Sequence, residues 1–140
     1  MSTYQIKIEY LGTNFVGWQR QKNDLSVQEV LEKVLSKRLK EKITVIGSGR
    51  TDAGVHATEQ SAHFKTKQHI DDRDTFINSV NFFLNKYPIS ILSIKKRPKK
   101  FHARHSAIKR TYKYFIINRR SSLVIEKIKR GILRKNSMLN

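Results

Sequence analysis

The N-terminal residues alternate between apolar and polar side chains with a period of two. Tyr4, Ile6, Ile8 and Tyr10 occupy every second position, and glutamine, lysine and glutamate stand between them. Successive side chains of a strand point to opposite faces, so this alternation predicts a strand with one buried face. The chain is therefore expected to open with a half-buried strand.

Two later segments have the spacing of helices. Ser26 followed by Glu29 has the form of a capping box, and apolar residues then recur at intervals of three and four. This pattern predicts a helix over residues 27–41. An aspartate-rich stretch at 71–74 favours the start of a second helix, which Pro88 stops.

Short β-branched or alternating segments at 43–46, 60–66 and 89–97 predict three more strands. The order β-α-β-β-α-β predicts an α+β fold: a ferredoxin-like βαββαβ antiparallel sheet with two helices on one face and the other face free for a ligand. A further strand is expected at 108–117 with no obvious partner, and its unpaired edges predict self-association. Apolar residues in 118–140 have loosely helical spacing.

Positive charge is concentrated towards the C-terminus. The chain has 140 residues, 29 Lys and Arg against 11 Asp and Glu, and a formal net charge of +18. Residues 95–135 contain sixteen of these bases and one acid, Glu126. Such a block predicts a polyanionic partner, and nucleic acid fits better than a membrane because 97–113 lacks a large apolar face. We therefore expect a ferredoxin-like lobe at 1–97 and, at 98–140, a basic connector that begins a second lobe.

Several kinds of site are excluded or disfavoured by composition. The chain has no cysteine, which excludes disulfides, thiolate metal sites and a cysteine nucleophile. His102 and His105 have H-x-x-H spacing, but no third ligand or nearby acid supports zinc, so no metal is expected. The N-terminus has no apolar signal-peptide core and no long apolar run follows, which predicts a cytoplasmic protein without a membrane anchor.

The segment 49–57, Gly-Arg-Thr-Asp-Ala-Gly-Val-His-Ala, has the most unusual chemistry. Asp52 is the only carboxylate between Glu41 and Glu59, and two glycines let a ligand approach the backbone closely. An aspartate is an anion at neutral pH and can act as a nucleophile or a base, but it repels phosphate. Catalysis explains such a residue in a basic protein. An Asx turn or a structural ion pair explains it equally well on local grounds.

This nine-residue string resembles the signature of the TruA-type tRNA pseudouridine synthases. Three other stretches resemble the family's motifs in the expected order. They are Tyr-Leu-Gly at 10–12 with Gly-Trp-Gln-Arg-Gln at 17–21, Ser-Val-Gln-Glu at 26–29, and the block from Phe101 to Tyr114. Leu11 stands where aspartate is common in the family. The resemblance covers about residues 4–120, which correspond to the N-terminal half of a family member.

The resemblance implies an isomerase that converts uridine to pseudouridine in the anticodon stem-loop of tRNA, at positions 38 to 40. Asp52 would be the catalytic nucleophile, Tyr112 the aromatic residue that supports the flipped base, and Arg50 an RNA contact. The other substrate-binding residues implied are Thr51, Arg20, Gln19 and Arg104. No cofactor or metal is expected, because the glycosidic bond is broken and remade without redox change. The resemblance also implies tRNA as partner and a homodimer.

Other interpretations of the same residues stay open. The chain could be a truncated, catalytically weak or inactive fragment that still binds RNA, or a non-catalytic RNA-binding module on the same sheet. Trp18 either stacks on RNA or packs in the core, and packing is favoured. Tyr112 and Tyr114 share a strand face, so both could belong to a core.

Overall fold

The computed structural model describes residues 1–114 in full and the backbone of residues 132–138. Its elements, in chain order, are β1 (Ser2–Tyr10), the 3-10 helix η1 (Gly12–Asn14), α1 (Val27–Leu39), β2 (Ile46–Gly47), β3 (His56–Thr66), α2 (Arg73–Leu84), β4 (Ile89–Arg97), β5 (Ala107–Tyr114) and β6 (Ile132–Met138). None of the helices in this described part of the chain is long and apolar enough to cross a membrane.

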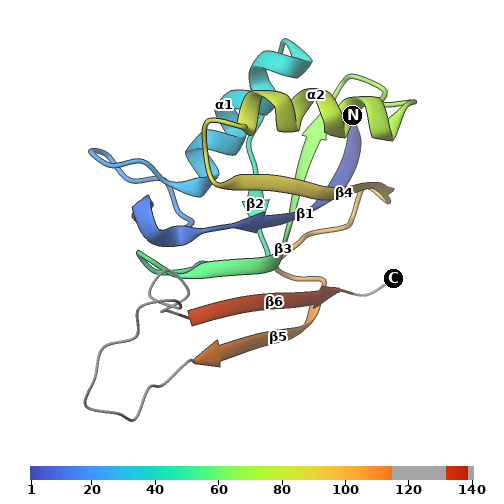
Figure 1. The fold of residues 1–140 in the computed structure, drawn as a ribbon. Helices are drawn as coiled ribbons and strands as arrows, with labels where there is room; N and C mark the ends of the chain where they lie inside the picture. Colours follow the sequence, from blue (N-terminus) through green and yellow to red (C-terminus); the bar gives the residue numbers. More distant parts are fainter. Residues whose placement is uncertain (115–131, 139–140) are drawn as a thin grey trace, which may run out of the picture.

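The sheet confirms the ferredoxin-like arrangement. Strand β1 lies between β3 and β4 and is antiparallel to both, while β2 pairs with the C-terminal half of β3, with Ile46 opposite His63. The order β4-β1-β3-β2 is therefore that of the predicted βαββαβ unit. Helices α1 and α2 lie together on one side of it (Figure 1). The predicted α+β fold is confirmed.

The alternating residues of β1 form the centre of the core. Tyr4, Ile6, Ile8 and Tyr10 are almost completely buried under the helices, and the Tyr4 ring stacks on Phe64 with centroids 5.9 Å apart. Burying each large apolar side chain contributes about 1.5–3 kcal/mol. The alternation in the sequence thus identified β1 as the strand whose side chains pack between the sheet and the helices.

Both helices begin at the predicted polar caps. The Ser26 hydroxyl accepts the Glu29 N–H at 3.2 Å. At α2 the Asp72 carboxylate accepts hydrogen bonds from the Thr75 N–H and hydroxyl, which lower the pKa of that carboxyl group. The first helix ends at Leu39, two residues before the predicted end, because Lys40 adopts a left-handed conformation with φ 54°.

One expectation about the C-terminal part, the strand without a partner, is wrong. Strand β5 does have a partner: it pairs antiparallel with β6, with Tyr112 opposite Arg134, and β6 pairs in parallel with β3. Residues 132–138 are a strand, not part of a helix, because hydrogen bonds to two neighbouring strands outweigh a loosely helical spacing in a short apolar segment. The end of the expected strand, at 115–117, and residues 118–131 and 139–140 lie outside the described residues.

The β5 and β6 strands extend the sheet on the side of β3 away from β1 (Figure 1). Strand β5 is paired with β6 on one side and is the last of the described strands in the sheet, so the self-association expected of 108–117 stays a prediction. The predicted division of the chain at residues 97 and 98 stays a prediction.

The face opposite the helices is partly covered by the turn at 98–106. The Ala103 N–H donates to Nδ1 of His63 at 2.9 Å, and the His102 ring lies edge-on to His63 with centroids 4.8 Å apart. His63 is only 2% exposed. Burial, the neighbouring His102 and Lys65 lower its pKa from 6.5 to about 4. The face expected to be free therefore carries a neutral, buried histidine.

This histidine predicts a loss of stability in mild acid. In the unfolded chain His63 gains a proton below about pH 6.5, whereas in the folded protein it stays neutral until about pH 4. The free energy of unfolding should fall by on the order of 3 kcal/mol between these pH values from this residue. Urea unfolding at a series of pH values measures it. In His63→Asn, whose Oδ1 can still accept the Ala103 N–H, this part of the loss should disappear.

The exposed His69 provides the control, because it lies in the loop before α2 and His69→Asn leaves the buried cluster intact. The free energy of unfolding of His69→Asn should therefore fall between about pH 6.5 and 4 as much as that of the wild type. Identical pH profiles for the wild type and His63→Asn would contradict the assignment.

Candidate active site

The loop between β2 and β3 presents Asp52 at its tip. The Val55 N–H donates to the backbone carbonyl of Asp52 at 3.1 Å and closes a turn, in which Gly54 has a φ of +81°. The side chain of Asp52 is exposed, and no hydrogen bond or ion pair joins it to Arg50 or to any other described residue. Neither the Asx-turn nor the ion-pair interpretation therefore accounts for this aspartate.

Two glycines from the preceding loop hold this turn in place. Gly17 has a φ of +107°, and a Cβ atom there would overlap the carbonyl oxygen of Thr51. A Cβ atom on Gly12 would overlap the carbonyl of Val55. Only glycine permits such close backbone contact, so the motifs at 10–21 and 49–57 are fitted to each other.

Hydrogen bonds complete the attachment. The hydroxyls of Tyr10 and Thr51 lie 2.7 Å apart, and the Trp18 N–H donates to the Thr51 carbonyl at 3.0 Å. The Gly12 N–H donates to Nδ1 of the buried His56 at 2.8 Å. Thr51 is only 7% exposed and points into the protein. It positions the loop, and its predicted contact with substrate stays a prediction.

The first residues of the loop are held by β3. Ser48 donates its N–H to the Ser61 carbonyl at 2.8 Å, and the buried Gln60 donates Nε2–H to the Gly49 carbonyl at 2.7 Å. The loop is thus fixed at both ends and at Thr51, while Asp52 stays in solvent. A fixed backbone around a free carboxylate is the preorganisation that a catalytic group needs.

A shallow pocket of about 180 Å³, which we call the Arg50 pocket, lies beside this loop. Its lining residues are Trp18, Gln19, Gln28, Ile46, Gly47, Arg50 and Arg104. Three of the predicted site residues, Gln19, Arg50 and Arg104, therefore meet here from distant parts of the chain. The two guanidinium groups and the Gln19 amide can bind a phosphate or the edge of a base, whereas the Gln28 amide is engaged by the Arg20 N–H and the Val45 carbonyl.

Trp18 belongs mainly to the core. It is buried, its ring packs at a tilt on Tyr10 with centroids 6.3 Å apart, and its indole lies against Gly47. The favoured packing interpretation of Trp18 is confirmed.

Arg20 makes an ion pair with Glu32, a buried carboxylate of α1. The other oxygen of Glu32 accepts the Val45 N–H at 2.9 Å. A buried charge without a partner would cost several kcal/mol, so Arg20 has a structural task that the sequence did not indicate. Its side chain is still 57% exposed, and an RNA contact stays a prediction.

Tyr112 lies on β5, two strands away from β3. Its ring is 45% exposed, and in register it is opposite Arg134, which in turn is opposite Ala57. Two strand spacings place Tyr112 roughly 10 Å from Ala57, near the end of the Asp52 loop. Its role towards a substrate base stays a prediction.

The structure also assigns a task to Arg110, which had no predicted role. Its Nη2 and Nε atoms both donate to the Ser48 carbonyl, at 2.7 and 3.2 Å, and Nη2 also reaches the Arg104 carbonyl at 3.1 Å. Arg110 shares a strand face with Tyr112, so it ties the strand of Tyr112 to the first residue of the Asp52 loop. The sequence shows Arg110 two residues before Tyr112, but it does not indicate that the Ser48 carbonyl accepts its hydrogen bonds.

Among the described residues, no group of three or more His, Asp or Glu side chains could hold a metal ion.

Comparison with known families identifies the class of protein. The sequence matches the family model described as tRNA pseudouridine synthase over residues 6–106. The chain belongs to this family of isomerases, which confirms the resemblance seen in its motifs.

Relatives of this chain include proteins named tRNA pseudouridine synthase A. The protein of Pelagibacter ubique (strain HTCC1062) is 58% identical over 127 residues, covering 91% of this chain and 52% of the relative. The protein of Ehrlichia chaffeensis is 49% identical over 126 residues, covering 88% and 50%. The chain thus spans about half the length of the curated relatives it matches.

The fit between the two loops predicts unequal effects of two glycine substitutions. Gly17→Ala adds both an unfavourable φ and a steric overlap with Thr51, whereas Gly54→Ala adds only the unfavourable φ because nothing lies within 4 Å of its Cβ position. We expect Gly17→Ala to lower the free energy of unfolding by roughly 3 kcal/mol or more, and Gly54→Ala by about 1–2 kcal/mol. Urea unfolding measures both. Equal losses would show that the backbone contact at Gly17 is unimportant.

Proposed function

We propose that this protein isomerises uridine to pseudouridine in tRNA with Asp52 as the nucleophile. The observation that carries the proposal is an exposed carboxylate, without a partner among the described residues, on a loop fixed at both ends beside the Arg50 pocket. Membership of the tRNA pseudouridine synthase family supports the same reaction and tRNA as the partner.

A carboxylate is sufficient for this chemistry. A carboxylate oxygen of Asp52 bonds to C1′ of the ribose as the N1–C1′ bond breaks and leaves a uracil anion. The uracil turns, and its C5 displaces the carboxylate from C1′. The proton on C5 is then lost and N1 gains a proton, so substrate and product are isomers and no electrons are exchanged with another molecule.

The target nucleotide must leave its stack before Asp52 can reach C1′. Unstacking costs a few kcal/mol, which stacking and phosphate contacts offset. Tyr112 is assigned the contact with the flipped base, and Arg50, Arg104 and Gln19 the neighbouring phosphates or base edges. The motifs favour the anticodon stem-loop, positions 38 to 40, as the target, a homodimer as the assembly and the cytoplasm as the location.

A non-catalytic RNA-binding fragment is the second candidate, because the chain spans about half the length of its relatives. The two candidates share the RNA contacts and differ only in turnover. An activity assay therefore separates them.

Asp52→Asn tests the nucleophile. The substitution keeps the shape of the side chain and removes its charge, so the release of tritium from C5-labelled uridine in a tRNA transcript should fall by at least about 10³-fold. The dissociation constant for the same RNA should stay within about threefold, since the carboxylate contributes no attraction to phosphate.

Asp24→Asn is the matched control, because Asp24 is an exposed aspartate of the loop before α1. It should leave turnover unchanged. Retained turnover in Asp52→Asn would refute the nucleophile, and binding without tritium release by the wild type would assign the chain to the non-catalytic candidate.

Arg110→Lys tests whether the tie between β5 and the Asp52 loop positions the reacting groups. Lysine keeps the positive charge but cannot place two donors on the Ser48 carbonyl. Turnover should fall about 10- to 100-fold with little change in RNA affinity, because a displacement of about 1 Å has this effect. Lys109→Gln on the opposite strand face is the control and should preserve turnover. A loss of affinity with unchanged turnover would make Arg110 an RNA contact instead.

A further inference from the structure

A second basic pocket, of about 280 Å³, lies at the other edge of the sheet. We call it the β4 pocket. Its lining residues are Gln5, Lys7, Arg73, Ser93, Ile94, Lys95 and Arg97. Four of these carry positive charge and none is acidic. The proposed chemistry at Asp52 makes no use of this pocket.

Arg97 is held in position as a donor. Its Nε donates to Oε1 of Gln5 at 2.7 Å, and Nε2 of Gln5 donates to the Ser61 hydroxyl at 2.8 Å. Gln5 is only 3% exposed, and the guanidinium lies over the Phe101 ring at 5.3 Å. In the part of the chain that the structure describes, these are the interactions of Arg97, so its two terminal nitrogens can donate to a ligand. A fixed guanidinium is well suited to phosphate oxygens.

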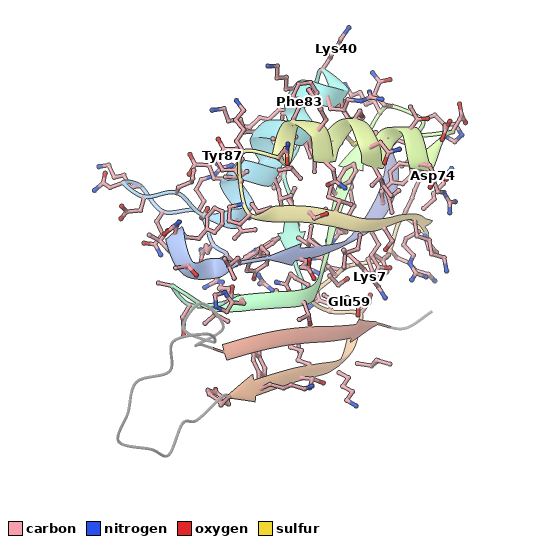
Figure 2. All side chains as sticks on the ribbon, viewed as in Figure 1. Lys7, Lys40, Glu59, Asp74, Phe83 and Tyr87 are labelled. Atoms are coloured by element: carbon pink, nitrogen blue, oxygen red, sulfur yellow. The ribbon has the colours of Figure 1, made fainter. Side chains whose placement is uncertain are left out.

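The nearby carboxylates do not cancel the charge of the pocket. Glu59 is bound to Lys7 at 2.8 Å, and Figure 2 shows this pair on β1 and β3. Asp72 is engaged by Thr75 at the start of α2. Neither Asp72 nor Asp74, which Figure 2 labels on α2, lines the pocket, whereas Arg73 does. Three cations, Arg73, Lys95 and Arg97, thus remain for an anion.

The two pockets lie on one path across the sheet. In register, Lys95 is opposite Gln5, Gln5 is opposite His63, and His63 is opposite Ile46, which lines the Arg50 pocket. Three strand spacings separate the ends of this row by roughly 14 Å. The turn at 98–106 crosses the same face, with Arg97 before it and Arg104 of the Arg50 pocket within it. An RNA strand that passes over this turn can therefore touch both pockets.

We propose that the β4 pocket binds backbone phosphates of the RNA whose target nucleotide reaches Asp52. The inference rests on RNA being the substrate, as proposed above, but not on catalysis. A polyanion fits the site better than a small metabolite because the lining carries four cations and no acid, and because a second basic pocket lies about three strand spacings away along the same row of residues.

The experiment compares two double variants that remove the same charge. Arg73→Gln with Lys95→Gln removes two exposed cations of the β4 pocket, and Lys33→Gln with Lys86→Gln removes two exposed lysines of α1 and the turn after α2. Fluorescence anisotropy with a labelled anticodon stem-loop RNA, between about 50 and 200 mM salt, gives the dependence of the binding constant on salt.

The pocket variant should have a slope of log K against log salt that is shallower by about 1 to 2, since each phosphate contact contributes about 0.7–0.9. Its affinity at low salt should fall at least about tenfold, and the control should stay close to the wild type. In turnover, KM should rise while kcat is unchanged, because these contacts bind ground state and transition state alike.

The outcomes separate the pocket from the proposed reaction. Equal slopes for the two double variants, together with normal turnover, would overturn the pocket and leave the reaction standing. A shallower slope in the pocket variant alone, from a protein that forms no pseudouridine, would support the pocket and overturn the proposed reaction. Saturable binding of inorganic phosphate that RNA does not displace would assign the pocket to a free anion and overturn the proposal.

Discussion

The close contact between the loop after β1 and the loop before β3 is the constraint on which the site depends. Gly12 and Gly17 bring the two backbones together at distances that no Cβ atom permits, and Thr51 is bonded inward to Tyr10. These anchors fix the backbone on both sides of Asp52, while its side chain is exposed. An exposed carboxylate on a fixed backbone is accessible to a substrate.

The two faces of the sheet carry different kinds of side chains. One face packs against the helices and carries the apolar core. The other face carries buried polar residues, such as Gln5 and His63. Within the described residues no buried polar side-chain atom lacks a hydrogen-bond partner. Gln5 bonds to Arg97 and His63 to the Ala103 N–H, and such satisfied polar groups specify where the turn at 98–106 and the basic side chain before it lie.

Local pattern predicted those parts of the fold that depend on local interactions. The alternation of β1 and the caps at Ser26 and Asp72 involve residues a few positions apart, and the structure confirms them. The partner of β5 was not predictable in this way. It comes from 132–138, whose few apolar residues fit a helix or a strand, and the sheet alone provides the hydrogen bonds that decide between them.

The sequence by itself determined the order of the elements, the basic character of the chain and the family, because motifs and charge are properties of residue type and spacing. The tertiary structure decided which side chain of each motif does what. In it, Thr51 points inward and Asp52 is exposed. Arg20 forms an ion pair with Glu32, and Arg110 donates hydrogen bonds to the Asp52 loop. These outcomes depend on contacts between segments far apart in the chain, and no local pattern encodes such a contact.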